Sequence, residues 1–90
     1  MQRRAVVSVV GKDQIGIISN VTTVLSDNKM NILDISQTIL QDFFTMIMLI
    51  DIKDPSNLEK LQNKFKPVED ELGLKINIQL EDVFQAMHRV

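Results

Sequence analysis

The sequence predicts an α+β fold, in which a four-stranded antiparallel sheet carries two long helices on one face. Four short segments are rich in β-branched or alternating apolar residues, and two longer segments repeat apolar residues at helical spacing. These segments follow one another in the order βαββαβ, and a third helical segment closes the chain. Two strand segments are apolar on both faces, as central strands are, while the other two alternate as outer strands do.

Length and charge narrow the classes of function. The chain has 90 residues, so we expect one domain over residues 1–90, and a formal net charge of −2 does not favour nucleic acid as a partner. Without cysteine there is no thiolate metal site, and we expect neither a metal nor a cofactor. The longest apolar run, at 46–50, is too short to span a membrane, and the start leaves no room for a signal peptide, so we expect a cytoplasmic protein.

The first strand is expected at residues 4–10, which are apolar on both faces after Arg4 except at Ser8, as in a strand covered on both sides. A helix follows from Gly16 to about Asn28. Its apolar residues form a single stripe, namely Ile17, Ile18, Val21, Val24 and Leu25.

Between strand and helix lies the segment 11–18, which reads Gly-Lys-Asp-Gln-Ile-Gly-Ile-Ile. Asp13 is expected to cap the helix by accepting from backbone N–H groups, a contribution of about 1 kcal/mol. The unpaired N–H groups of the first helical turn form a natural site for a carboxylate or another anion. A phosphate loop is disfavoured, because Ile17 and Ile18 stand where Lys and Ser or Thr are required. The alternative is that this segment is only a connection from strand to helix, in which the glycines serve the backbone geometry and bind no ligand.

The second and third strands are expected at 31–41 and 43–52, joined by a tight hairpin at Gln41–Asp42. Both faces of the third strand are apolar, so we expect it to be covered on both sides. One face of the second strand is polar and exposed to water, and the other carries Leu33, Ile35 and Ile39.

The second long helix is expected to open at 54–56, with Pro55 near its start, and to end at Gly73. Its apolar stripe keeps one register across Pro67, which favours one kinked helix. The alternative is two helices separated by a break near Lys66, because proline removes a backbone hydrogen bond. The stripe consists of Leu58, Leu61, Phe65, Val68 and Leu72.

A half-buried outer strand at 74–80 and a short closing helix at about 81–89 complete the chain. This order indicates the ferredoxin-like arrangement, with the first and third strands central. Since helices cover only one face of such a sheet, Val6, Val10 and one face of the third strand leave an apolar patch on the other face. We expect the closing helix or a second copy to cover this patch, and we predict a homodimer.

The residue pattern contains no visible catalytic machinery, so we expect the chain not to be an enzyme. His88 has no cysteine or second histidine with which to share a metal, and the acidic residues are scattered as ordinary surface charge. An acylphosphatase-like hydrolase shares the topology but needs an arginine in the first loop, where only Lys12 occurs.

Two motifs of the sequence resemble those of a known family. The segment 11–18 after a strand, followed by a helix and by Lys-Met-Asn-Ile at 29–32, resembles the ACT domain, in which Asp-x-x-Gly-Ile/Leu and Asn-Ile recur at about this separation. The blocks 9–13, 31–38 and 43–46 resemble more narrowly a group of stand-alone bacterial and archaeal ACT proteins related to the regulator of the glycine cleavage system.

The resemblance implies a regulatory module that binds a small ligand, usually an amino acid, at a subunit interface. Such a ligand is held by the first strand-to-helix loop of one copy and by the start of the second strand of its neighbour. Carried over to this chain, the implied ligand-binding residues are Asp13, Gln14, Ile15, Gly16, Ile17, Asn31 and Ile32.

Gln14 and Ile15 depart from the commoner Asp-Arg-Pro-Gly of the family, which makes the loop less rigid. We expect no attached catalytic or DNA-binding domain, so any signal passes to a separate partner protein or through assembly. The alternative is a ligand-free module for protein–protein interaction, which works through the open face of the sheet or the closing helix.

Overall fold

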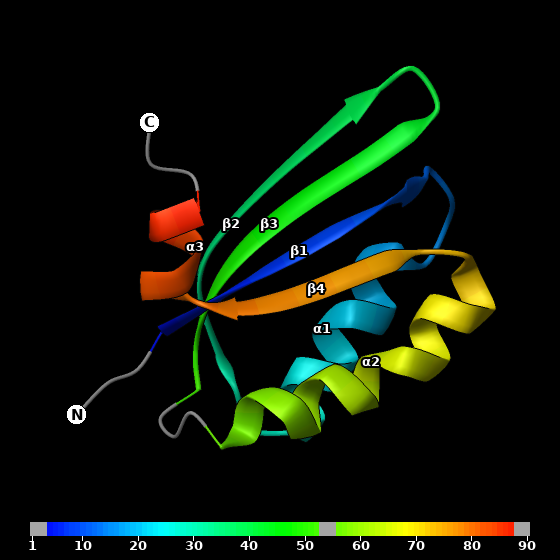
Figure 1. Cartoon of the computed structure of the whole chain (residues 1–90). Helices are drawn as coiled ribbons and strands as arrows, with labels where there is room; N and C mark the ends of the chain where they lie inside the picture. Colours follow the sequence, from blue (N-terminus) through cyan, green and yellow to red (C-terminus); the bar gives the residue numbers. More distant parts are fainter. Residues whose placement is uncertain (1–3, 53–55, 88–90) are drawn as a thin grey trace.

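The computed structural model describes residues 4–52 and 56–87, and its elements follow the predicted order (Figure 1). The elements are β1 (Arg4–Lys12), α1 (Ile17–Asp27), β2 (Asn31–Leu40), β3 (Phe43–Asp51), α2 (Asn57–Leu72), β4 (Lys75–Leu80) and α3 (Glu81–Met87). None of the helices in these two ranges is long and apolar enough to cross a membrane.

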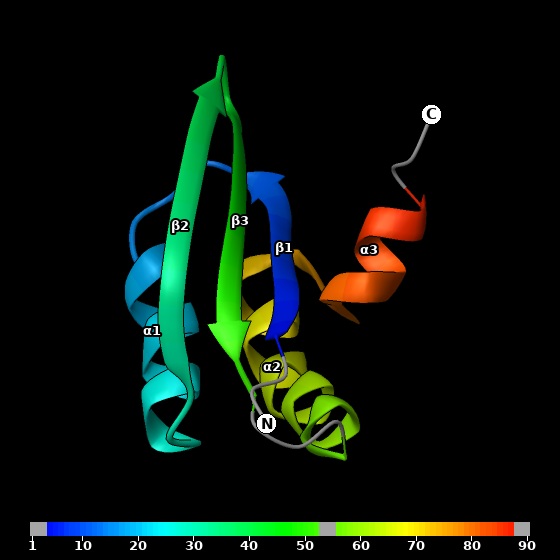
Figure 2. The ribbon, with the colours of Figure 1, turned by 90° about the vertical axis from the view of Figure 1, so that its left-hand side faces the viewer.

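The sheet has the strand order β2-β3-β1-β4, and every neighbouring pair is antiparallel. β1 and β3 are therefore central, and α1 and α2 pack on the same face, which confirms the predicted ferredoxin-like arrangement (Figures 1 and 2). The core lies between this face and the helices. Its fully buried side chains include Val7, Val9, Ile17, Val21, Leu25, Met46, Met48, Ile50, Leu61 and Phe65.

α2 runs unbroken through Pro67, so the preference for one helix over two is confirmed. The stripe explains this continuity, because Leu61, Phe65 and Val68 on both sides of the proline are all buried in the core. The helix ends as predicted at Gly73, which has a left-handed conformation with φ 65°. The predicted start at Pro55 lies outside the described residues.

α3 contacts β1 and β4 on the open face of the sheet, beside β1 in Figure 2. Val6, at that end of β1, is only 7% exposed. Farther along the same face Val10, Phe43 and Ile47 are 46%, 62% and 42% exposed. The prediction that the first and third strands are covered on both sides is therefore wrong for this part of the face, because a helix of seven residues reaches only one end of it. Residues 88–89 of the predicted closing helix lie outside the described ranges.

β2 is exposed at all ten of its positions, so water reaches not only its polar face, as predicted, but also the side chains Leu33, Ile35 and Ile39. One reason is its place at the edge of the sheet, in a hairpin that reaches past the helices in Figure 1. A second reason is a bulge between Ile32 and Asp34, which interrupts the strict alternation. Ile32 and Ile35 both lie opposite helix-facing residues of β3, yet Ile35 is still 44% exposed.

Candidate functional site

The loop between β1 and α1 is tied to the hairpin turn between β2 and β3. The N–H of Asp13 donates to the carbonyl oxygen of Asp42 at 2.7 Å. That turn contains Gln41 in a left-handed conformation with φ 55°, as a two-residue hairpin requires. The end of β2 is therefore held beside the loop, although the two are distant in sequence.

Gly16, and not Asp13, occupies the cap position of α1. Gly16 has φ 95°, which favours glycine, and the helix has no side-chain cap hydrogen bond. The predicted Asp13 cap is therefore wrong, because the left-handed turn at Gly16 starts the helix three residues later. Asn20 instead donates from Nδ2 to the Gly16 carbonyl oxygen at 2.7 Å. The first N–H groups of α1, from Ile17 onward, have no partner within the helix.

The side chain of Gln14 links the loop to the C-terminal end of α2. Its Nε2 donates to the Leu72 carbonyl oxygen at 2.7 Å and to the Lys12 carbonyl oxygen at 3.1 Å. Both amide donors of the side chain are thus engaged within the chain. Gln14 therefore ties the loop between β1 and α1 to the C-terminal end of α2.

The loop forms one wall of a cavity of about 260 Å³. Four of the seven predicted site residues line it, whereas Ile15 does not and is 99% exposed. The lining is Asp13, Gln14, Gly16, Ile17, Ile18, Ser19, Gln37, Ile39 and Phe44. Sequence reasoning missed Ile18 and Ser19 in the first turn of α1, and it missed Gln37, Ile39 and Phe44. The hairpin turn is the signal for the strand residues, because a turn at 41–42 pairs Ile39 with Phe44 and brings both next to the loop.

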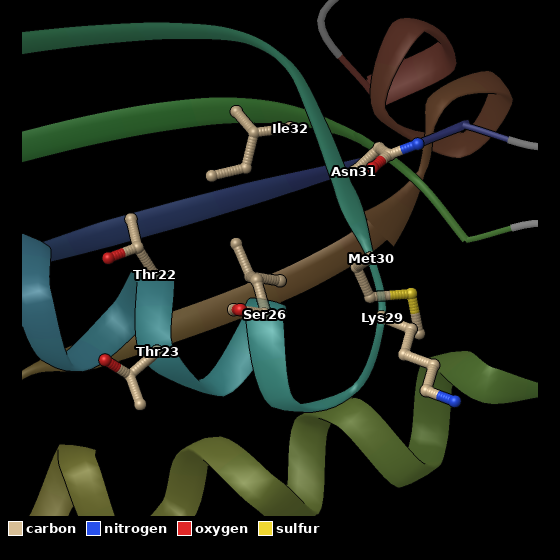
Figure 3. Close-up of a pocket in the computed structure, with 8 residues that line it drawn as sticks. Thr22, Thr23, Ser26, Lys29, Met30, Asn31 and Ile32 are labelled. Carbon is tan, nitrogen blue, oxygen red and sulfur yellow. The ribbon is translucent and has the colours of Figure 1, made fainter.

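Asn31 and Ile32, the other two predicted site residues, line a different and larger cavity of about 540 Å³ at the C-terminal end of α1 (Figure 3). Its remaining lining is Thr22, Thr23, Leu25, Ser26, Lys29 and Met30. Lys29 follows α1 in a left-handed conformation with φ 59°, and its N–H donates to the Ser26 carbonyl oxygen at 3.0 Å. This arrangement of hydrogen bonds closes the helix and turns the chain into β2.

The two cavities lie at opposite ends of α1. A helix of 11 residues is roughly 16 Å long at 1.5 Å per residue, so a ligand the size of an amino acid does not touch both within one chain. The structure thus brings together the loop residues but not the loop and Asn31. Within 4–52 and 56–87, no group of three His, Asp or Glu side chains is placed to hold a metal ion.

Comparison with known proteins relates these features to one family. Residues 3–79 match the family model of the ACT domain. A UPF0237 protein of Methanococcus maripaludis is 49% identical over 86 residues, which cover 94% of this chain and 96% of that protein. A UPF0237 protein of Clostridium perfringens is 47% identical over 87 residues, covering 96% and 98%.

Solved structures agree with this match. An ACT domain protein from Streptococcus pneumoniae has a TM-score of 0.80 and 36% identity, covering 98% of this chain and 100% of that chain. The regulatory subunit of aspartate kinase from Thermus thermophilus has a TM-score of 0.70 and 19% identity, covering 86% of this chain and 50% of that chain, which shows a common fold. The resemblance drawn from the motifs is confirmed.

Proposed function

Since the chain belongs to the ACT-domain family, we propose that it is a small regulatory module, not an enzyme, that binds an amino acid or a similar ligand between two copies of itself. We further propose that the liganded dimer modulates a separate partner protein in the cytoplasm. One observation carries the proposal: the two groups of predicted site residues lie at opposite ends of α1. Only a second copy can unite them around one small ligand.

The free edge of β2 supports such a pairing. Identical edge strands that pair antiparallel across a two-fold axis bring the start of one strand beside the end of the other. Pairing centred on Ile35 sets Asn31 of one copy opposite Ile39 of the second copy. The larger cavity of one copy then adjoins the loop cavity of the other, and the dimer has two equivalent sites.

The side of α1 that borders this edge also supports an interface. Ile18, Thr22 and Ser26 are spaced by four residues and line the two cavities together with residues of β2. From Gln14 to Ser26 the sequence contains no charged residue. Depletion of charge is characteristic of interface centres, and small side chains let two helices approach closely.

The chemistry of the combined site suits an amino acid. The unpaired N–H groups at the start of α1 accommodate a carboxylate, which the positive end of the helix favours. The Asp13 carboxylate and the side-chain carbonyl of Asn31 from the second copy accept hydrogen bonds from an ammonium group. Gln14 contributes by keeping the loop in place.

A thermal-shift screen of the twenty amino acids tests the proposal. A ligand at 100 times its Kd adds roughly 2.7 kcal/mol to the free energy of unfolding. We expect Asp13→Ala and Asn31→Ala each to abolish the response while the circular dichroism spectrum of the fold is kept, since the bond from Asp13 to Asp42 uses the backbone N–H. Asn77→Ala, at an exposed position of β4, is the matched control and keeps the response. Absence of a shift with every amino acid at millimolar concentration contradicts the proposal.

The second candidate is the ligand-free interaction module. The exposed Val10, Phe43 and Ile47 on the open face favour it, because α3 leaves this apolar area uncovered. In that case removal of residues 81–90 abolishes association with a partner, and amino acids have no effect on stability.

A further inference from the structure

Resting on the proposed pairing, we infer that Ile15 of each copy inserts into the larger cavity of the other copy and thereby completes the ligand site. Ile15 is a fully exposed apolar side chain, and the mixed lining of the cavity at the C-terminal end of α1 includes the apolar residues Leu25, Met30 and Ile32. Among the described residues, nothing covers Ile15 and no side chain fills the cavity, and each feature suits the other across a two-fold axis.

The chain presents Ile15 in a fixed position. Its neighbours are anchored, Asp13 through the 2.7 Å bond to Asp42 and Gln14 through the 2.7 Å bond to Leu72. Ile15 itself is 99% exposed and lies between Gln14 and Gly16, whose carbonyl oxygen accepts from Asn20 Nδ2 at 2.7 Å. A side chain held ready in this way loses little conformational entropy when it enters a partner.

The cavity matches an aliphatic side chain. Met30 and Ile32 supply accessible apolar surface beside the fully buried Leu25, and Figure 3 shows Ile32 directed towards the α1 side chains Thr22 and Ser26. Its volume of about 540 Å³ lies in the range of small-molecule sites, roughly 300–1,000 Å³, and exceeds what one isoleucine fills. The remaining space is left for the ligand.

The two-fold geometry brings the two features together. The loop carrying Ile15 lies against Gln37 and Ile39 of its own β2, because these residues line one cavity. Antiparallel pairing of β2 with a second β2 puts that end of the strand beside Asn31 and Ile32 of the other copy. Because the contact is isologous, it occurs twice in each dimer. The ligand and Ile15 then share one cavity, so ligand binding and association strengthen each other.

The charge of the cavity makes the inference specific. Among the described residues that line it, Lys29 is the charged one. A cation introduced at position 15 is therefore repelled on insertion, whereas an anion is attracted. Insertion at any other apolar site of the surface has no reason to depend on Lys29.

The experiment measures the dimer dissociation constant by analytical ultracentrifugation without added ligand. We expect Ile15→Lys to weaken association about 100-fold, the effect of an unpaired charge at an interface, and Ile15→Glu to weaken it clearly less. The double variant Ile15→Lys/Lys29→Glu restores association to within about tenfold of the wild type, since the charges are then opposite. Val83→Lys, at a 47% exposed position of α3, is the control and leaves association unchanged.

Three results overturn the inference: a wild-type protein that stays monomeric at every concentration, normal association of Ile15→Lys, or failure of Lys29→Glu to rescue it. Folding is checked by circular dichroism, and the full exposure of Ile15 leaves the fold of each copy untouched. The amino-acid screen separates the two proposals. Stabilisation by an amino acid with no effect of Ile15 variants removes the insertion alone, whereas charge rescue without any amino-acid response removes the ligand alone.

Discussion

The α1/β2 half and the α2/β4 half of the molecule have the same architecture but different outer surfaces. Seven of the 16 residues of α2 are charged, whereas the 11 residues of α1 include one, Asp27. The exposed side chains of β4 between its buried positions are polar, among them Lys75 and Asn77. β2 instead exposes large apolar side chains, including Ile39 at 55% and Leu40 at 72%.

The two edge strands of the sheet also differ in how far they are covered by other parts of the molecule. The edge of β4 is closed by α2, because Gln62 donates to the Ile76 carbonyl oxygen at 2.9 Å and accepts from the Ile78 N–H at 3.2 Å. Glu69 accepts from the Ile76 N–H at 3.0 Å. On β2 the N–H of Ile35 donates to the carboxylate of its own neighbour Asp34 at 2.8 Å, and among the described residues of β2 every position is exposed. A covered edge is the ordinary defence against strand pairing, and for this reason we propose that the second copy pairs with the exposed edge of β2.

The largest expected contrast is in core stability. Phe65→Ala in α2 removes a fully buried ring, and we expect the free energy of unfolding to fall by about 3–5 kcal/mol. Ile39→Ala, on the exposed end of β2, costs less than about 1 kcal/mol in the monomer. Urea unfolding at low protein concentration measures both. Equal losses of unfolding free energy would contradict the view that, within one chain, the α2/β4 half is packed against its neighbours and the end of β2 is not.

A charge on the uncharged side of α1 is expected to act on association and not on folding. Thr22→Lys puts two like charges near the proposed two-fold axis, and we expect the dimer to lose about 2–5 kcal/mol. Monomer stability stays within about 0.5 kcal/mol, since lysine favours helices more than threonine does. Asn63→Lys, at an exposed position of α2, is the matched control. Light scattering measures the fraction of dimer. An equal loss of dimer for both substitutions would contradict the predicted difference between the surfaces of α1 and α2.

Opening the covered edge is expected to make β4 resemble β2. Gln62→Ala leaves the Ile76 carbonyl and the Ile78 N–H without their side-chain partner, a loss of about 1–3 kcal/mol in thermal or urea unfolding. We also expect new self-association, visible as larger species in size-exclusion chromatography. Asn63→Ala, one residue away on the exposed side of α2, changes neither quantity.

The smallest effect concerns the ends of the two helices. α2 ends in a left-handed glycine, Gly73, whereas α1 is followed by a left-handed lysine, Lys29. Lys29→Gly relieves the strain of that conformation, and we expect a gain of about 1 kcal/mol in the free energy of unfolding. If the melting temperature falls instead, the lysine side chain contributes a stabilising contact of its own.

The sequence pattern predicted those features whose physical cause lies within a few residues of the chain. The stripe Leu61, Phe65 and Val68 predicted a helix through Pro67, because apolar residues at helical spacing pack together on one side. The cap at Asp13 failed for a local reason that the pattern does not contain. Several residues of the loop are able to start a helix, and the left-handed φ of Gly16 decides among them.

Longer-range features escaped prediction because they depend on pairing between strands. The bulge after Ile32 arises from the register with β3, and it changes which side chains of β2 face the helices. The neighbours Gln37 and Ile39 reach the loop only through the hairpin and the bond from Asp13 to Asp42.

By itself the sequence determined the order of elements, the central and outer strands, the family motifs and the residues that carry them. Periodicity and turn chemistry act within a few residues, so they are legible without a fold. Only the tertiary structure decided that the loop and Asn31 lie in separate cavities, that one sheet edge is covered and the other is not, and that Ile15 projects outward. These facts depend on distances between residues far apart in the chain, which packing and strand register establish.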